Sequence, residues 1–496
     1  MQHAVILPIL IPLIVGALLL LPPLQQSAQS RRWLSGVGIA LLLAVCGWNL
    51  SQSSDGVSQY YLLGNWPAPF GIVLLLDQIS ALFVALTAVL AAGAFIYSCA
   101  GEDERGAYFQ SLLQFLLMGI NGAFLTADLF NLFVFFEVLL ISSYGLLLHG
   151  GGKLRTKAGL HYVLLNLLGS AIFLLALALL YGVTGSLNMQ DIAVRITALS
   201  AQQLLLLKSA AALLLIVFGL KAAILPLHFW LPSAYAAASP AVAALFAVMT
   251  KIGVYCLLRV FHTLFAADAS LLTDFIQPLL WWTGLLTLAL AAIGVVAAQS
   301  LKRLVAYLVL LSVGTMVTVL SIGTVAAVAA VLYYSIHSTL IAAALFLLVD
   351  YLAQQRGTVA DRLVSARPLA NPVLIGSLFF LCAITVIGMP PLSGFVGKIW
   401  LLQAATESPQ RIGLWFTLLG SSLLVLIALS RAGSTVFWRV SQQPALPAQA
   451  SGRQLAAIVL LMLSSLLLVL LAAPVMQFCL DAALQLQAND VSGGQA

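Results

Sequence analysis

Apolar runs long enough to cross a membrane recur along this chain from its beginning to its end. Hydrophobic residues make up 62% of the 496 residues, and charged residues only 7%. About 20 apolar residues in a helix span the hydrocarbon core of a bilayer, and lipid permits only helices and closed barrels to do so. The sequence therefore predicts an all-α polytopic membrane protein that forms a single transmembrane domain over residues 1–496, with no soluble domain.

Hydropathy and helix-breaking residues predict about fourteen transmembrane helices. We place these spans at 4–24, 33–50, 74–98, 108–127, 129–149, 158–182, 204–238, 240–266, 275–298, 302–322, 324–352, 373–406, 412–438 and 454–480. The first span has no basic residue before it and no small-residue cleavage site, which favours a retained helix over a signal peptide. The more polar stretch 189–198 is expected to lie flat at the membrane interface.

The basic residues between the spans predict the orientation. Fourteen of the 21 lysines and arginines fall in alternate connections and three in the opposite ones. The positive-inside rule places the larger set in the cytoplasm, so both termini are expected outside. The net charge of +6 is spread over these short loops, so we interpret it as a topology signal and predict no nucleic-acid binding.

Two predicted spans, 204–238 and 373–406, are longer than a crossing needs and contain prolines. The first contains Pro226 and Pro232, and the second contains the Pro390-Pro391 pair. Proline removes a backbone donor and clashes with the preceding turn, so both helices are expected to be discontinuous. Unpaired backbone at this depth is tolerated only inside protein or beside water.

The broken helices are the seventh and twelfth spans, so they lie five spans apart. A repeat with an odd number of crossings must have an inverted second copy, as in transporters that build sites at broken helices. We predict two inverted five-helix repeats, spans 4–8 (108–266) and spans 9–13 (275–438). Spans 1–3 (1–98) precede them and span 14 (454–480) follows them.

Five charged residues lie inside apolar spans: Glu137, Lys221, Lys251, Arg259 and Lys398. A charge at mid-bilayer costs at least about 3 kcal/mol on insertion scales. Such residues usually face the protein interior or a water-filled path. The default hypothesis for this series is therefore the movement of ions or protons.

Glu137 and Lys221 are the first expected members of a proton path. Glu137 is about 12 Å deep in its span, which has no basic residue, and we expect it to pair with a lysine on another helix. Burial disfavours the charged form of Lys221 and a nearby carboxylate favours it, and this opposition can act as a switch. The alternatives are a protonated, inert Glu137 and a static buried salt bridge.

Lys251, His337 and Lys398 are expected to continue the path. Lys251 is a central relay near mid-depth, His337 has a side chain suited to proton exchange near neutral pH, and Lys398 is a terminal proton donor or acceptor. A snorkelling lysine at 398 and a packing histidine at 337 are the alternatives.

Four more side chains are possible auxiliary groups. They are His228 among the prolines of the seventh span, Tyr334 and Ser338 beside His337, and Arg259. The hydroxyl groups are equally typical of helix packing. A guanidinium does not readily release a proton, so we interpret Arg259 as structural or field-setting.

The sequence carries no sign of a cofactor. It has neither a P-loop nor a G-x-G-x-x-G motif, and its five cysteines fall in apolar helices without a C-x-x-C pair. We predict no cofactor, no metal site and no redox centre, and therefore not an enzyme.

Several segments resemble one known family. These are the Glu137 helix, GLKAAILPLHFWLPSAYAAASPAVAALFAVMTKIGVYCLLR (Gly219 to Arg259), SLKRLVAYLVLLSVG (Ser300 to Gly314) and GMPPLSGFVGKIW (Gly388 to Trp400). They resemble the antiporter-like subunits shared by respiratory complex I, membrane-bound hydrogenases and Mrp-type cation/proton antiporters. The resemblance implies fourteen helices, inverted repeats with helices seven and twelve broken, and the proton-path roles given above.

Within that family the chain is most similar to the D subunits of the Mrp-type multisubunit Na+/H+ antiporters. It ends just after the fourteenth span, and it has lysine at 398 where a similar-sized complex I subunit has glutamate. Its Leu308-Val-Leu-Leu-Ser312 stretch is less polar than the family pattern, which leaves the hydroxyl groups of that span without an implied role.

Three functions compete at this point. The first is a proton-translocating subunit of a hetero-oligomeric Na+/H+ antiporter in the bacterial inner membrane, with other membrane antiporter subunits as partners. The second is a proton-pumping membrane subunit of a redox enzyme of the complex I or hydrogenase type. The third is a stand-alone exporter, which the Glu/Lys series and the two breaks disfavour.

Overall fold

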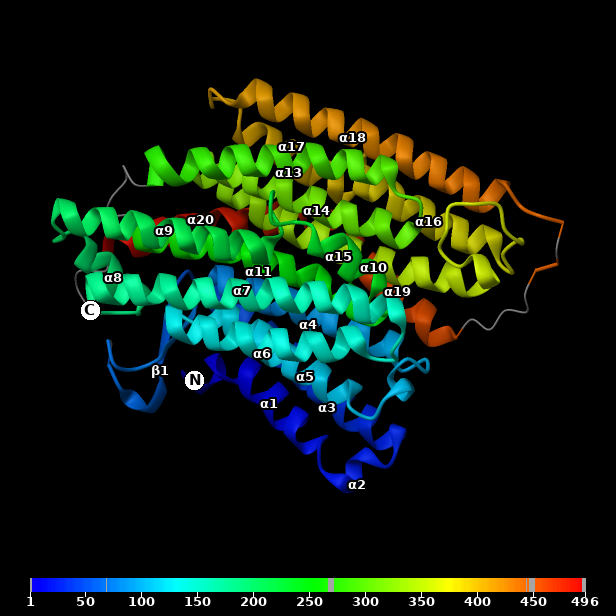
Figure 1. The fold of residues 1–496 in the computed structure, drawn as a ribbon, viewed down its shortest axis with the longest axis horizontal. Coiled ribbons are helices and arrows are strands. Elements are labelled where there is room, and N and C mark those ends of the chain that lie inside the picture. Colours follow the sequence, from blue (N-terminus) through cyan, green and yellow to red (C-terminus); the bar gives the residue numbers. More distant parts are fainter. Residues whose placement is uncertain (1, 68, 266–271, 443, 446–450, 493–496) are drawn as a thin grey trace.

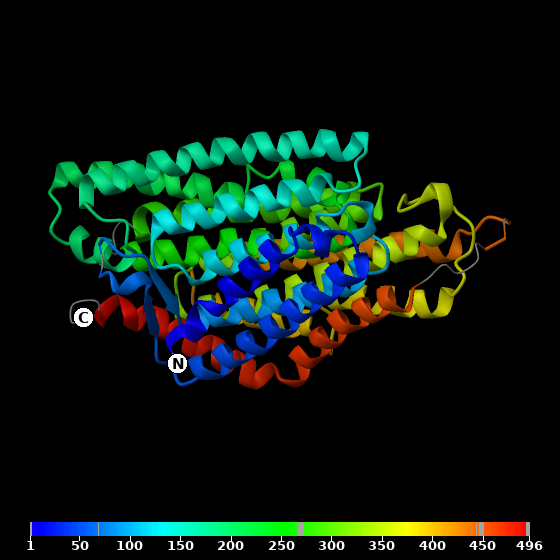
Figure 2. The ribbon, with the colours of Figure 1, turned by 90° about the horizontal axis from the view of Figure 1, so that it is seen from below.

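A computed structural model describes residues 2–67, 69–265, 272–442, 444–445 and 451–492. Most helices lie with their long axes close to parallel, and the same arrangement is visible after a quarter turn (Figures 1 and 2). Within the described residues, eleven helices are long and apolar enough to cross a membrane, and three more apolar helices are shorter. The protein is therefore a multi-pass membrane protein, and the count of fourteen crossings stays a prediction.

The long apolar helices are α3 (Ala28–Ser53), α4 (Gln78–Ser98), α6 (Leu129–Leu148), α7 (Lys153–Thr184), α9 (Ala201–Ala222), α11 (Pro240–Phe265), α13 (Gln277–Ala297), α14 (Leu301–Leu320), α15 (Val325–Gln355), α18 (Arg411–Gly433) and α19 (Gly452–Leu470). The shorter ones are α1 (Leu7–Leu18), α5 (Phe109–Leu125) and α16 (Pro372–Ile387). The remaining helices are α2 (Pro22–Gln25), α8 (Met189–Ile196), α10 (Trp230–Ala237), α17 (Ser393–Ala404) and α20 (Ala472–Ser492). Five-residue π-helical segments lie before α13 (Leu272–Ile276) and after α18 (Ser434–Trp438), and short 3-10 turns lie at Gln2–Val5, Leu63–Asn65, Asp103–Arg105 and Gly357–Val359.

The start of the third span differs from the prediction. Residues Val73–Leu76 form strand β2, which pairs antiparallel with β1 (Gln59–Leu62), so the expected helix over 74–98 begins only at Gln78. An apolar run such as Val-Leu-Leu-Leu suits a buried strand as well as a helix. The boundary is fixed by Asp77, whose carboxylate accepts a 2.9 Å hydrogen bond from Ser80 N in a capping box.

The last predicted span also differs. The single helix expected over 454–480 is two helices, because α19 ends at Leu470 and α20 begins at Ala472. Pro474 lies in the first turn of α20, where its missing N–H costs no hydrogen bond. Residue 266, the predicted end of the first repeat, lies outside the described residues, and the division into repeats stays a prediction.

Both long spans are interrupted, as predicted. The helix α9 ends at Ala222, Ala223 adopts a left-handed φ of 61°, and α10 begins at Trp230. In the second span α16 ends at Ile387, Gly388 has a φ of 84°, and α17 begins at Ser393. Pro232 was expected to contribute to the first break, but it lies in the first turn of α10 and interrupts nothing.

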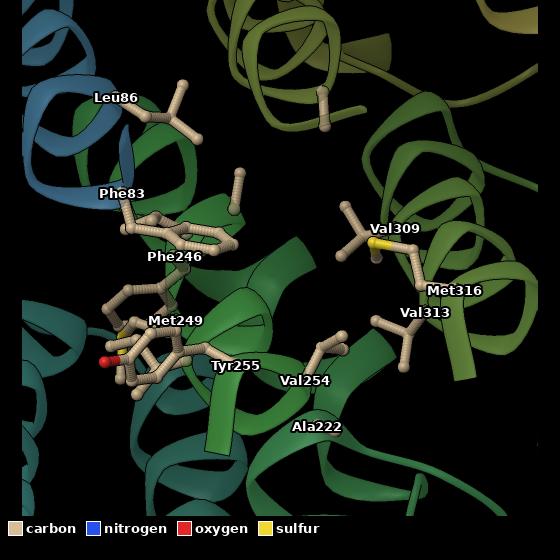
Figure 3. Packing of buried hydrophobic residues seen from close by; sticks show 14 of the residues in the cluster. Phe83, Leu86, Ala222, Phe246, Met249, Val254, Tyr255, Val309, Val313 and Met316 are labelled. Atoms are coloured by element: carbon tan, nitrogen blue, oxygen red, sulfur yellow. The ribbon is translucent and has the colours of Figure 1, made fainter. Parts of the chain in front are cut away.

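The centre of the protein is α11, whose membrane-crossing window is completely buried. Figure 3 shows side chains of α11 between those of α4 and α14, with Phe83 and Tyr255 close together and Met316 on the other side. The rings of Phe83, Phe124 and Tyr255 contact one another with centroids 4.9–5.5 Å apart. This packing fixes α11 between helices of both predicted repeats.

The first break packs directly against α11. A Cβ atom on Gly253 would lie 2.3 Å from the backbone nitrogen of Ala222 and 2.8 Å from its Cβ. Only a residue without a side chain permits this approach, because the contact is with backbone that cannot move aside. Gly253 therefore sets the distance between the end of α9 and the helix that carries Lys251.

We predict that Gly253→Ala destabilises the protein by about 1–3 kcal/mol through overpacking. The measurement is the apparent melting temperature of the purified protein in detergent. The control is Gly182→Ala on α7, because a Cβ atom there meets nothing within 4 Å and should leave the melting temperature unchanged or slightly higher. Equal melting temperatures for the two variants would show that the contact with Ala222 is not a constraint.

Candidate functional site

Glu137 lies partly buried on α6 and accepts a hydrogen bond from the hydroxyl of Ser170 on α7. One turn earlier on α7, Asn166 offers its side-chain oxygen to the Lys221 ammonium at 3.0 Å. The same ammonium lies over the ring of Phe136, the residue before Glu137, with Lys221 Nζ 5.4 Å from the ring centroid. One face of α7 therefore supplies a neutral partner to the acid and to the lysine.

The direct pairing of Glu137 with a lysine that the sequence predicts is not present. Lys221 is within electrostatic range of Glu137, but among the described residues neither has an oppositely charged partner at salt-bridge distance. Lys221 lies at the last turn of α9, where the break begins. A proton held at this position is stabilised by dipoles and by an aromatic face rather than by a fixed ion pair.

A small cavity adjoins Lys221. Its volume is about 10 Å³, and the polar side chains around it are those of Asn166, Tyr162, Trp230 and Lys221 itself. A cavity of about this size holds a single water molecule when polar partners are present. The lysine therefore has room for one water beside its ammonium group.

Lys251 is completely buried on α11 and donates a 3.1 Å hydrogen bond to the hydroxyl of Ser312 on α14. The Ser312 hydroxyl in turn donates to the carbonyl oxygen of Val309 in its own helix. Ser312 belongs to the stretch to which the sequence assigned no role. The structure makes it the neutral partner of the central lysine, where the first predicted repeat meets the second.

His337 on α15 has Nδ1 2.9 Å from the hydroxyl of Ser393, which lies 2.9 Å from the hydroxyl of Ser465 on α19. The histidine is buried and within electrostatic range of both Lys251 and Lys398. Gly394 permits the contact, since a Cβ atom there would meet the carbonyl oxygen of Thr385 at 1.9 Å and the His337 ring at 3.0 Å. The second break thus places the start of α17 against the His337 ring.

Lys398 on α17 is held by backbone that the second break exposes. Its ammonium donates to the carbonyl oxygen of Ile387 and to the hydroxyl of Ser422 on α18, each at 2.8 Å, and to the carbonyl oxygen of Val386 at 3.4 Å. The last carbonyls of a helix have no partner within it, so a helix end can stabilise a cation. The lysine is buried and points toward this helix end, which does not fit the snorkelling alternative.

The auxiliary residues take different positions. The His228 ring is buried in the first break against Phe229, and its Nδ1 has no hydrogen-bond partner in the described part of the chain. The Tyr334 ring lies 5.5 Å from that of His337, whereas the Ser338 hydroxyl makes only a 3.4 Å contact with a carbonyl oxygen of its own helix. Of these three side chains, Tyr334 is thus the one whose ring contacts a member of the series, and the roles of His228 and Ser338 stay predictions.

Arg259 differs from every other charged residue of the series. Its guanidinium binds both carboxylate oxygens of Asp77, at 2.7 Å and 2.6 Å, and also donates to the hydroxyl of Tyr255 at 3.2 Å. The two side chains are 6% and 1% exposed, so the pair is buried. The one cation that cannot exchange its proton is thus neutralised by an acid, while the lysines and the histidine have neutral partners.

The sequence does not predict the partners Asn166, Ser170, Ser312, Ser393, Ser422 and Asp77. Serine and asparagine are common in membrane helices, and which of them faces a lysine depends on packing that hydropathy does not report. Asp77 had a usable signal, since aspartate directly before an apolar helical run is a preferred N-cap residue.

The comparisons with known proteins identify the family of the chain. Residues 126–427 match the family model described as NADH:quinone oxidoreductase/Mrp antiporter, TM. The chain belongs to this family. The matched region runs from just after α5 into α18, and it therefore contains all five residues of the predicted proton path.

Relatives of this family member cover nearly its whole length. A probable K(+)/H(+) antiporter D subunit of Rhizobium meliloti is 41% identical over 88% of this chain and 87% of that protein. The Na(+)/H(+) antiporter D subunit of Alkalihalophilus pseudofirmus is 37% identical over 98% of this chain and 97% of that protein. A chain in the structure of the Mrp complex from Dietzia sp. DQ12-45-1b superposes with a TM-score of 0.85, at 26% identity over 98% of each chain.

We predict that Asp77→Asn destabilises this antiporter-family protein by about 3–5 kcal/mol, because it leaves the Arg259 charge buried without a counter-charge. Asparagine still caps α4, so the loss isolates the ion pair. The double variant Asp77→Asn with Arg259→Met should recover most of the lost stability, measured as apparent melting temperature.

The control for this pair is Asp191→Asn. Asp191 binds Arg195 at 3.0 Å in a more exposed pair, which is worth at most about 1 kcal/mol. A small effect of Asp77→Asn, equal to that of the control, would contradict the structural role of the buried pair.

Proposed function

We propose that this chain is the proton-translocating subunit of a multisubunit monovalent cation/proton antiporter in the bacterial inner membrane. One observation carries the proposal: five ionisable side chains from α6, α9, α11, α15 and α17 each bind a neutral group, and all but the partly buried Glu137 are buried in the protein. Both termini are proposed to lie outside, because the basic connections are assigned to the cytoplasm.

The proton path is proposed to run from Glu137 through Lys221, Lys251 and His337 to Lys398. A lysine bound only to an amide or hydroxyl oxygen can give up its proton without leaving an unpaired carboxylate behind. The proton affinity of each lysine then depends on the charge of the next site in the series, because a proton on one site lowers the proton affinity of its neighbour. Such a series can pass protons in steps through bound water.

The exchanged cation is proposed to be monovalent, with Na+ as the ion that the sequence favours. The two relatives quoted above carry names that specify K+ in one case and Na+ in the other. Exchange assays should therefore test both ions. These names describe antiporter subunits rather than redox enzymes, which disfavours the redox alternative.

The partners are proposed to be other membrane subunits of the antiporter, since the relatives are named as subunits and the Dietzia structure is that of a complex. Purification in mild detergent should yield further hydrophobic subunits. Co-purification of iron–sulfur or flavin subunits would contradict this proposal and favour the redox-enzyme alternative.

We predict that Ser312→Ala lowers cation/proton exchange roughly tenfold or more in everted vesicles. A hydrogen bond to a charged group is worth about 1.5–3 kcal/mol, and its loss disfavours the protonated form of Lys251. The control is Ser321→Ala, because within the described residues the Ser321 hydroxyl donates only to the carbonyl oxygen of Thr318 on the preceding turn. Wild-type exchange by an assembled Ser312→Ala complex would exclude Lys251 as a relay.

A further inference from the structure

One buried acid outside the membrane spans has no role in the proposed path. Glu102 lies between α4 and α5 and is 8% exposed. Its Oε2 accepts a long 3.5 Å hydrogen bond from the backbone nitrogen of Ala241, at the start of α11. Its Oε1 has no hydrogen-bond partner within the described residues. An acid in this state lacks the partners that usually hold a buried carboxylate ionised.

The Ser239 hydroxyl, just before α11, is close enough to the Glu102 carboxyl to favour its ionised form, and it makes no regular hydrogen bond in the described part of the chain. A hydroxyl can donate to a carboxylate or accept from a carboxylic acid. Both protonation states of Glu102 therefore have a partner available, and only a rotation of the hydroxyl separates them. That is the environment of a proton-binding group rather than of a fixed counter-charge.

The charged groups around Glu102 do not neutralise it. Within electrostatic range are Arg105 in the same connection, Arg155 on α7, Asp350 on α15 and Tyr97 on α4. Asp350 already binds Lys302 at 3.0 Å and accepts from the Tyr97 hydroxyl at 3.1 Å. The neighbouring acid Asp103 binds Arg32, and the hydrogen bond of the His149 ring is to the backbone oxygen of Glu102, not to its carboxylate. Across the described residues, no cation lies within salt-bridge distance of Glu102.

Burial raises the pKa of Glu102 from its ordinary 4.5 to about 7, against the opposing effects of Ser239, Ala241 and Arg105. The group is therefore neutral below about pH 7 and ionised above it. This change of charge falls in the range of cytoplasmic pH, where a proton can be taken up and released at every cycle.

The carboxyl lies at the start of the helix that carries the central lysine. Lys251 lies ten positions after Ala241 on α11, a rise of about 15 Å along the helix. The hydroxyl of Tyr235 lies along this stretch, where it donates to the carbonyl oxygen of Phe246 at 2.6 Å and approaches Thr250. The Tyr235 hydroxyl therefore provides a polar group between Glu102 and Lys251.

We propose that Glu102 is a proton-binding site at the cytoplasmic end of α11, through which protons that reach Lys251 exchange with cytoplasmic water. The carboxylate takes one proton from the α11 side to become the acid, and it returns to the carboxylate when that proton passes to water. This proposal rests on the proposed antiporter function and extends it to a site outside the five-residue path.

The test uses the assembled complex with Glu102→Gln, which holds the site neutral. Two measurements are made across about pH 6 to 9: infrared difference spectra of the protonated carboxyl band, and cation/proton exchange in everted vesicles. In the wild-type complex, one protonated-carboxyl signal should disappear as the pH rises through about 7. The Glu102→Gln complex should lack that signal. It should also exchange several-fold more slowly, and its exchange rate should show no change near pH 7. The control is Glu104→Gln, an exposed acid of the same connection that binds Arg32.

Ser239→Ala provides a second variant that keeps the acid. Removing the hydroxyl that favours the carboxylate should shift the carboxyl signal and the exchange profile together toward higher pH. An infrared signal that Glu102→Gln leaves unchanged, or an unaltered exchange profile in either variant, would overturn the proposal. Absence of exchange by the wild-type complex would instead contradict the proposed function, while the infrared titration would still report on Glu102.

Discussion

The structure depends on which partner group each charge buried in the apolar bundle binds. This chain uses two solutions. Arg259, which cannot release its proton, forms a bidentate pair with Asp77, which also caps α4. Lys221, Lys251 and Lys398 have amide, hydroxyl or carbonyl oxygens instead. The first solution fixes a charge and joins two helices. In the second, loss of the lysine proton leaves no unpaired carboxylate behind, which is the basis of the proposed proton exchange.

The two helix breaks contribute differently to this arrangement. In the first, the freed backbone is satisfied within the protein: the nitrogen of Leu225 donates to the Thr287 hydroxyl at 2.8 Å, and the Trp230 indole donates to the carbonyl oxygen of Leu220 at 3.1 Å. In the second, the carbonyl oxygen of Ile387 accepts from Lys398. The first break therefore positions Lys221 by packing against α11 and α13, while the second break itself supplies the ligand for the last lysine.

The sequence predicts the features that carry a large energetic cost. Charges in apolar runs and prolines in overlong spans are readable without a structure. The overlong spans led to the two interrupted helices, although Pro232 lies outside the first break. The partners are not readable, because Ser312 or Asn166 becomes significant only when packing turns it toward a lysine. The strand at 73–76 was missed because its apolar residues suit a helix equally. Glu102 was missed because a loop acid is usually solvated, and only the fold buries this one.

The central claim is that the buried ionisable residues lie along one hydrated path through the protein. The most direct measurement is cryo-electron microscopy of the assembled complex at a resolution that shows ordered water. The account predicts water molecules that connect Lys221, Lys251, His337 and Lys398 in sequence, with one in the small cavity beside Lys221. Dry apolar packing between successive members of this series would contradict it.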